Sequence, residues 1–302
     1  MIGGRGSEPT ASGGVDGSSA AQVRARPPEY LDEMIADFRS DGEGRYNHLG
    51  HWDRPDDDPL SISRAQAQQR MNDVVVALAE VGDGSRVLDV GCGFGGTLAA
   101  IDRTFDRVEL TGLDVDARQL AITSRLVPRP TNQLRWVNGD GCALPFADAS
   151  FDHVTSIEAM WHFPSRTAFL AEVGRVLRPG GRLAVVDILI SADAPERLGR
   201  SMDQIMTTLD PGFAPWPAPT DDLEAVVDAA SAAGLVCTAT VDATANTTPT
   251  YLDHGDGHEL PDSATFSSTA AVQFFVEMHL TKCLSVVYLG FERPSTTVRN
   301  SA

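Results

Sequence analysis

The chain has 302 residues, of which 42% are hydrophobic and 22% charged, so we expect a packed core rather than wholesale disorder. The 24 Lys and Arg residues against 42 Asp and Glu residues give a net charge of −18. This balance argues against a nucleic-acid backbone or an anionic membrane as the main partner, because both bind basic surfaces. Neutral or cationic small molecules remain as natural ligands.

Neither a membrane anchor nor a metal centre is predicted. No run reaches the roughly 18 to 20 apolar residues of a transmembrane helix, and the Gly/Ser-rich start lacks the apolar stretch of a signal peptide. The four cysteines form no CxxC pair. His254 and His258 have an H-x3-H spacing but lie among glycines, with no helix to align them. We therefore expect a cytoplasmic protein with no metal.

The N-terminal part divides into a tail and a helical cover. Residues 1–27 are rich in Gly, Ser and Ala and are predicted to be a flexible tail. Residues 28–82 form the predicted cover, with an amphipathic helix over 29–39, a polar loop over 45–53 and a helix that Ser63 caps and that runs to about residue 81.

From residue 86 onward, short β-branched runs alternate with helical stretches, which is typical of parallel βαβ units in a doubly wound sheet. The predicted strands are 86–90, 108–115, 134–140, 151–159 and 182–190, and the helices between them are about 97–105, 116–127 and 165–177. Prolines interrupt residues 191–220, which we interpret as a lid. A helix over 221–233, a strand over 235–243, a helix over about 266–282 and a last strand over 283–292 follow.

The sharpest local motif is VLDVGCGFGG at 87–96, an apolar strand that runs into glycines opening a helix. Glycines allow a tight turn and close approach of a ligand to the backbone. The next two strands end in Asp114 and Asp140, and the fourth ends near Ser156. Ligands of open α/β sheets bind at this edge. One alternative is a tight strand-to-helix turn with no ligand, and another is that Asp114 and Asp140 merely cap the helices that follow them.

At this point the sequence resembles a known family. VLDVGCGFGG, GLDVD, NGDGCALPF, FDHVTSIEAMWHF and LRPGGRLAVVD match, in order and spacing, the motifs of class I S-adenosylmethionine-dependent methyltransferases. The flanking YNHLGHWD and VDATANTTPTY resemble small-molecule enzymes of bacterial natural-product pathways, such as rebeccamycin sugar O-methyltransferase and the spinosyn pathway enzymes. The resemblance implies a Rossmann-like, seven-stranded sheet with its last strand antiparallel, and makes residues 83–302 the methyltransferase domain.

The resemblance also implies which residues bind the cofactor S-adenosylmethionine and its product S-adenosylhomocysteine. It places Gly91 and Gly93 against the methionine part and Asp114 on the ribose. It places Asp140, Gly141 and Cys142 at the adenine and lets Ser156 face the cofactor. Tyr30 and Tyr46 of the N-terminal cover are candidates to close over it. Trp52 belongs either to this cover or to the core.

Attack by a hydroxyl on the methyl group needs a base within hydrogen-bond reach. Glu158, His162 and Asp187 are the candidates at the ligand-binding edge of the sheet, and adjacent strand ends are expected to bring His162 and Asp187 together. Rebeccamycin-type enzymes carry two adjacent histidines here, whereas this chain has Trp161 in place of the first. A tryptophan suits an aromatic or isoprenoid acceptor, or a developing cation.

The acceptor itself is expected to be hydrophobic. The residues predicted to contact it are His51, Trp161, Met206, Phe213, Trp216 and Phe274. Each of these positions is also compatible with the core or, for His51, with a solvated loop. We therefore predict a methyltransferase for a hydrophobic secondary metabolite, acting on O or C. A non-methylating cyclase on the same scaffold is the alternative, and a nicotinamide-dependent oxidoreductase fits the later motifs poorly. A homo-oligomer is compatible with the sequence.

Overall fold

The fold is built on one seven-stranded sheet with the order β3-β2-β1-β4-β5-β7-β6. The structure is a computed structural model that describes residues 35, 46–54, 60–251 and 270–295. Its strands are β1 (Arg86–Val90), β2 (Glu109–Asp114), β3 (Gln133–Asn138), β4 (Phe151–Ile157), β5 (Leu177–Ile190), β6 (Val236–Asp242) and β7 (Leu284–Glu292). Strands β1 to β5 pair in parallel, whereas β7 runs antiparallel between β5 and β6. This confirms the predicted Rossmann-like sheet with its last strand antiparallel.

The described helices include six that the sequence predicts, within a few residues of the expected bounds, and short ones at 160–162, 194–198 and 244–251 that it does not predict. They are α2 (Arg64–Leu78), α3 (Gly96–Thr104), α4 (Ala117–Thr123), η1 (Met160–His162), α5 (Arg166–Val176), α6 (Ala194–Leu198), α7 (Met202–Phe213), α8 (Leu223–Ala232), α9 (Thr244–Thr247), η2 (Thr248–Tyr251) and α10 (Ala270–Leu280). Ser63 caps α2 as expected, and Gln66 completes a capping box by accepting from the Ser63 N–H. The tail at 1–27 and, apart from residue 35, the helix predicted over 29–39 lie outside the described residues.

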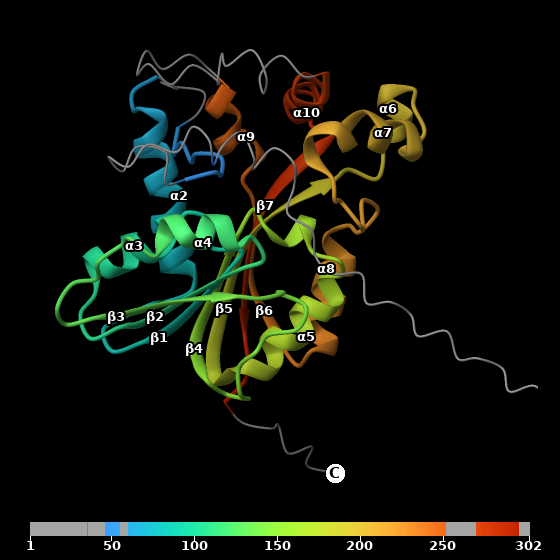
Figure 1. Ribbon diagram of the computed structural model, residues 1–302. Helices are drawn as coiled ribbons and strands as arrows, with labels where there is room; N and C mark the ends of the chain where they lie inside the picture. The colour runs from blue at the N-terminus through green and yellow to red at the C-terminus, as the bar shows by residue number, and fades with distance from the viewer. Residues whose placement is uncertain (1–34, 36–45, 55–59, 252–269, 296–302) are drawn as a thin grey trace, which may run out of the picture.

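Successive apolar side chains along each strand point to opposite sides, which gives the sheet two apolar faces. In β1, Val87 belongs to the layer that contains α2 and α3, whereas Leu88 and Val90 belong to the layer that contains α5 and α8. Figure 1 shows these helix pairs on opposite sides of the sheet. Because neighbouring side chains of a strand point to opposite faces, near-continuous apolar strands are what two covered faces require.

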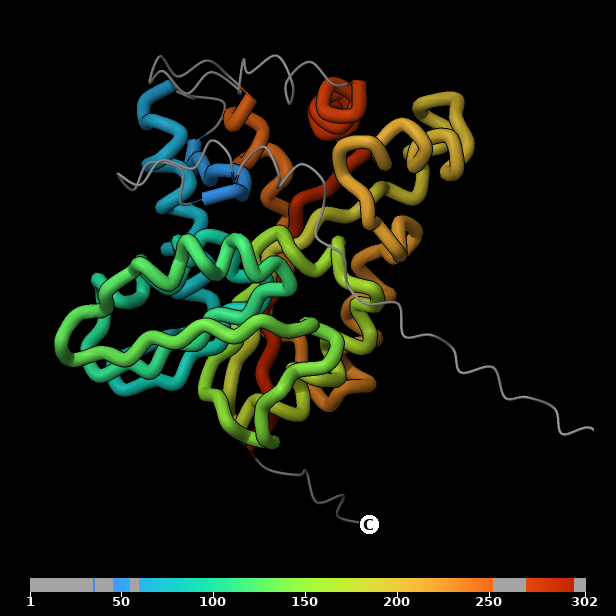
Figure 2. The backbone as a smooth tube through the Cα atoms, in the orientation of Figure 1, coloured from blue at the N-terminus to red at the C-terminus, as the bar shows by residue number. Residues whose placement is uncertain are grey.

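The carboxyl ends of the parallel strands lie under a second group of elements. Figure 1 places α6, α7, α9 and α10 together above this end of the sheet, so the predicted lid at 191–220 contains α6 and α7. Figure 2 shows the short 46–54 segment (blue) beside the orange chain of α9. There the N–H of Trp52 donates to the carbonyl of Asn246 at 2.9 Å, and Asn246 Nδ2 donates back to the carbonyl of Trp52 at 2.7 Å. None of the described helices has the length and apolar character needed to cross a membrane.

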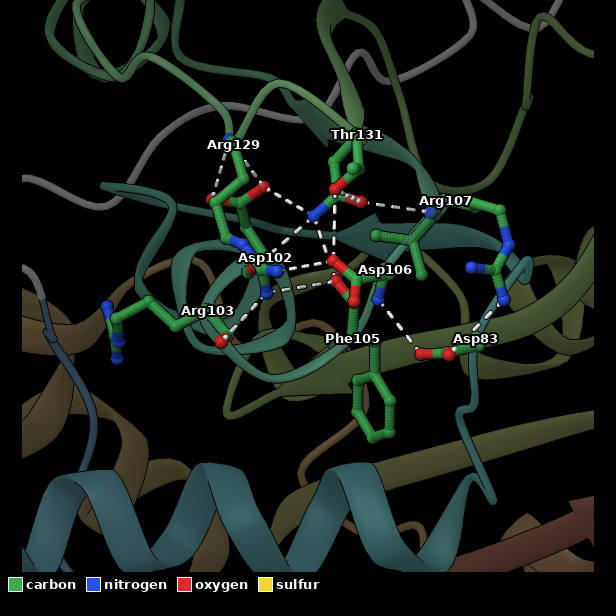
Figure 3. Close-up of polar contacts among 10 residues, drawn as sticks. Asp83, Asp102, Arg103, Phe105, Asp106, Arg107, Arg129 and Thr131 are labelled. Atoms are coloured by element: carbon green, nitrogen blue, oxygen red, sulfur yellow. Dashed lines mark hydrogen bonds and ion pairs between the residues drawn. The ribbon is translucent and has the colours of Figure 1, made fainter.

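A polar cluster at the other end of the molecule fixes the loop between α4 and β3 (Figure 3). Arg129 pairs with Asp106 and its N–H donates to Asp102. The buried Asn132 amide donates to the carbonyl of Phe105 at 2.9 Å and accepts from the N–H of Val108 at 3.2 Å. Asn132 therefore satisfies backbone groups on both sides of the turn into β2.

Replacing this amide should destabilise the fold. Asn132→Leu leaves the buried N–H of Val108 without its acceptor, and such an orphan costs about 1–3 kcal/mol. It also removes the shorter of two hydrogen bonds to the Phe105 carbonyl, which keeps Arg129 Nη1 at 3.5 Å. We expect the free energy of unfolding in urea to fall by about 2 kcal/mol or more. Thr131→Val is the matched control, because this exposed hydroxyl donates to Asp106 and to Asn132 at the surface. A loss for Asn132→Leu no larger than for the control would contradict the assignment.

Candidate active site

Strand β1 ends in a glycine turn that leads into α3. Gly91 and Gly93 have φ angles of 74° and 52°, in the left-handed region that other residues rarely adopt. A Cβ on Gly91 would also lie only 2.4 Å from the Cβ of Ala159. The turn therefore presents bare backbone, and the Gly93 N–H donates to Asp114 at 2.9 Å.

Asp114 is a buried carboxylate at the end of β2. One of its oxygens accepts from Gly93, and the other accepts from the N–H of Asp116 at 2.8 Å. Burial raises the pKa of Asp114 above its ordinary value, although these hydrogen bonds oppose the shift. The N-cap of α4 is Asp116, whose side chain accepts from the N–H of Arg118. The alternative in which Asp114 caps this helix is therefore wrong.

Three groups around the turn were not predicted, and they fit a cationic, ribose-bearing cofactor. Asp89 accepts from Thr155 Oγ1 at 2.7 Å, and burial raises its pKa to about 7. Oε1 of Gln119 is buried and has no hydrogen-bond partner within the described ranges. A Cβ built on Gly93 would lie 3.4 Å from this oxygen and 3.1 Å from the side-chain amide of Asn47, so both side chains border the glycine turn. A cation would offset the buried carboxylates, and a donor would satisfy Gln119.

The signals for these residues were present in the sequence but weak. Gln119 is a polar residue on the buried side of α4, in the first turn of that helix. Asn47 lies in the polar loop before α2, whose fold depends on distant contacts. Asp89 stands inside a buried apolar strand, where an ionisable residue is unusual and often functional.

The end of β3 forms a second turn close to the end of β1. Asp140 Oδ1 accepts from the N–H of Cys142 at 2.8 Å, so this side chain stabilises its own turn. A Cβ on Gly141 would lie 3.0 Å from Val90, which places the turn against β1. Ser156 is fully buried and its hydroxyl donates to the carbonyl of Val90 at 2.9 Å. Its hydroxyl thus ties β4 to β1, and its contact with the cofactor stays a prediction.

The segment before α2 lies over the ends of these strands. Tyr46 donates its hydroxyl to Gln69 on α2 at 2.6 Å, and Tyr30 is outside the described residues. Trp52 is 1% exposed and packs against the backbone of Gly50, so it belongs to the core of this segment. His51 Nδ1 lies 3.0 Å from the hydroxyl of Tyr288 on β7.

Glu158 and His162 lie just beyond β4, and burial favours the neutral form of both side chains. Both carboxylate oxygens of Glu158 accept from the N–H of Leu49, at 3.0 and 3.2 Å. Burial, with the charge of Asp187 as a smaller contribution, raises the pKa of Glu158 to about 8. Burial lowers the pKa of His162 to about 4, so its ring is neutral at pH 7. The carbonyl of Pro215 lies 2.9 Å from His162 Nδ1 and can only accept, so Nδ1 carries the proton and Nε2 the lone pair.

The predicted pairing of His162 with Asp187 is wrong. Asp187 is fully buried at the carboxyl end of β5 and accepts from Arg166 Nε at 2.8 Å. Arg166 is the first residue of α5 and is itself 3% exposed. A guanidinium neutralises a buried carboxylate better than a neutral imidazole does, and His162 takes the Pro215 carbonyl instead.

Aromatic rings gather beside these groups into a cluster that we call the aromatic wall. Trp161 lies 4.5 Å from Trp216 and 6.3 Å from Phe275, and Phe213 stacks on Phe275 at 4.5 Å (distances between ring centroids). The ring of Trp161 lies 3.6 Å from that of His162.

The wall is tied to the base candidates, because Trp161 Nε1 donates to the carbonyl of Glu158 at 2.8 Å. Met206 packs against the same core, to which Phe274 also belongs, and the ring of Phe274 lies 4.6 Å from the guanidinium carbon of Arg200. No group of three potential metal ligands occurs within the described ranges, and the cluster at 253–259 is outside them.

Comparisons with known proteins agree with this geometry. The model of a methyltransferase domain family matches residues 88–185. An O-methyltransferase of Pyrenophora dematioidea is 33% identical over 181 residues, which are 59% of this chain and 67% of that protein. An O-methyltransferase of Aspergillus nomiae is 31% identical over 60% of this chain and 77% of its own. Methyltransferase GfsG of Streptomyces halstedii is 35% identical over 55% of this chain and 56% of its own.

Solved structures show the same fold. The [4+2]-cyclase SpnF is 22% identical, with a TM-score of 0.61 over 83% of this chain and 88% of that chain. Geranyl diphosphate C-methyltransferase of Streptomyces coelicolor, solved with S-adenosyl-L-homocysteine, is 19% identical, with a TM-score of 0.64 over 88% and 98%. At these identities the likeness concerns the fold alone. Together with the relatives, it shows that the chain belongs to the class I S-adenosylmethionine-dependent methyltransferases that act on small molecules.

Proposed function

We propose that the enzyme methylates a hydrophobic secondary metabolite, with Glu158 as the general base. The observation that carries this proposal is the aromatic wall, which lies directly against His162 and is hydrogen-bonded to the backbone of Glu158. Apolar and aromatic surroundings with few placed polar groups are typical of sites for such ligands. The names of the relatives favour oxygen over carbon as the methylated atom.

The cofactor supplies the electrophilic methyl group, and the protein supplies binding, alignment and exclusion of water. We assign the ribose to Asp114 and Gln119, the adenine to the Asp140–Cys142 turn, and the methionine part to the turn at Gly91 and Gly93. The remaining predicted contacts, from Tyr30, Tyr46 and Ser156, are retained as part of this proposal. It is supported by the bare backbone of the glycine turn and by the partnerless Gln119 oxygen among the described residues.

The cofactor assignment predicts a loss of binding when Asp114 changes. Asp114→Asn removes the charge that accepts from two backbone N–H groups and from the ligand hydroxyls. Hydrogen bonds to charged groups contribute about 1.5–3 kcal/mol, so the Kd for S-adenosylhomocysteine should rise roughly 10- to 100-fold in isothermal titration. Asp222→Asn, which keeps the cap of α8, is the control and should bind as the wild type does. Equal affinities of the two variants would refute the assignment.

The two base candidates differ in how they handle a proton. A base must be unprotonated to act. Glu158, with a pKa of about 8, becomes competent as the pH rises through that value, and its proton affinity suits an acceptor hydroxyl better. His162 is neutral above about pH 4 and offers Nε2 as a hydrogen-bond acceptor. We assign the proton transfer to Glu158 and the orientation of the acceptor hydroxyl to His162, whereas Asp187 is held by Arg166 and supports the site only through that buried ion pair.

This assignment predicts the pH profile. The wild-type kcat/KM for the acceptor should rise with pH, with the midpoint of the rise near pH 8, and level off above it. Glu158→Gln should lower kcat roughly 100-fold or more and abolish the rise, whereas His162→Gln should keep the rise and mainly increase KM. A wild-type profile that is already level from pH 5 upward would identify His162 as the base instead.

A cyclase remains the second candidate function, because SpnF shares the fold. Product analysis with isotopically labelled cofactor and candidate metabolites separates the two. We expect one labelled methyl group in the product and one S-adenosylhomocysteine released per turnover. Product formed without S-adenosylhomocysteine would establish the cyclase.

We also retain His51, Met206 and Phe274 as proposed acceptor contacts, the cytoplasm as the proposed compartment and a homo-oligomer as compatible with the fold.

A further inference from the structure

The side chain of Arg166 occupies an unusual place for a cation. It is the first residue of α5, and the partial positive charge at a helix N-terminus disfavours a nearby cation. Its guanidinium is nevertheless buried and makes three hydrogen bonds, to Asp187, to the carbonyl of Ile188 at 3.2 Å and to the carbonyl of Ala218 at 2.8 Å. The third partner belongs neither to α5 nor to the sheet.

That partner lies in the connection between α7 and α8, residues 214–222, which we call the proline segment. Besides Ala218, its Asp221 carboxylate lies 3.6 Å from Arg166 Nη1. The beginning of the same segment contacts the proposed acceptor site, where the Pro215 carbonyl accepts from His162 Nδ1 and the ring of Trp216 lies edge-on to Trp161. One end of the segment is thus attached to Arg166 and the other to the acceptor residues.

We propose that Arg166 is a positioning residue of the acceptor site, which holds the proline segment so that Pro215 fixes the tautomer of His162 and Trp216 supports Trp161. The inference rests on the proposed function, in which His162 and Trp161 face the acceptor. Arg166 acts through the segment and does not touch the reacting atoms.

The planar guanidinium is suited to this role. Its donors are spread over a rigid fork, so one side chain serves the carboxylate of Asp187 and backbone carbonyls on two elements. A lysine ammonium concentrates its donors at one point. Arg166→Lys therefore keeps a cation beside the buried Asp187 but weakens the link to Ala218. Arg166→Ala is a poor test, because it leaves a buried carboxylate without its counter-ion.

The first readout needs no acceptor. In nitrogen-15 NMR of the side-chain histidines, wild-type His162 should be protonated at Nδ1 and titrate far below the usual pH range. In Arg166→Lys the signal should move towards a mixture of tautomers, and the titration should move towards the ordinary histidine value. The Kd for S-adenosylhomocysteine should stay within about twofold, because the proposed cofactor residues make no contact with Arg166 in the described ranges.

The second readout is turnover of the acceptor. Misplaced groups cost up to roughly 100-fold in rate, and we expect kcat/KM for the acceptor to fall about 10- to 100-fold with the KM for S-adenosylmethionine unchanged. Arg86→Lys is the matched control. Arg86 also pairs with a buried aspartate, Asp152, but at the opposite end of the sheet. It should behave as the wild type does in both readouts.

The outcomes are distinguishable. An unchanged His162 signal in folded Arg166→Lys would overturn the inference, even if turnover fell. An altered His162 signal with unchanged turnover would confirm the link but overturn the role of His162 in the proposed function. If Arg166→Lys does not fold, the double variant Arg166→Met/Asp187→Leu replaces the buried pair with apolar groups, which proteins often tolerate. It should show the same change at His162, and an unchanged signal there would again refute the proposal.

Discussion

The constraint on which this molecule depends is the burial of four acidic side chains at the carboxyl end of its parallel strands. Asp89, Asp114, Glu158 and Asp187 all lie at or near the carboxyl ends of parallel strands, and burial raises the pKa of each. Such groups are stable only when hydrogen bonds or counter-ions compensate them. Each acid therefore fixes another piece of the chain.

The four acids are compensated in different ways, and the difference separates the site into halves. Asp89 uses a hydroxyl of the neighbouring strand, and Asp114 uses the N–H of the glycine turn. Glu158 uses the N–H of Leu49, which brings the N-terminal segment over the sheet. Asp187 has an arginine. The proposed cofactor half thus depends on contacts within the sheet, whereas the proposed acceptor half depends on segments that pack onto it from outside.

This division explains how far sequence analysis reached. The strands, the glycine turn and the Ser63 cap follow from local patterns, because periodicity and capping act over a few residues. The partner of Asp187 did not follow. Topology places His162 and Asp187 at one edge, but it does not say which donor arrives there, and Arg166, four residues beyond His162, takes the carboxylate. Asn47 and Leu49 were missed as contacts for a related reason, since a bond across 109 residues leaves no local pattern.

The net charge of −18 can now be divided by location. Most acidic residues named in ion pairs are at least partly exposed, and such pairs contribute little to stability. Asp89 and Asp114 are different, because no arginine or lysine pairs with either of them in the described part of the chain. Two buried, unpaired carboxylates bind a cationic ligand more favourably than a neutral one of the same shape. Since S-adenosylmethionine is a sulfonium and its product a neutral thioether, the proposed cofactor site predicts that these two acids hold the cofactor more strongly than the product.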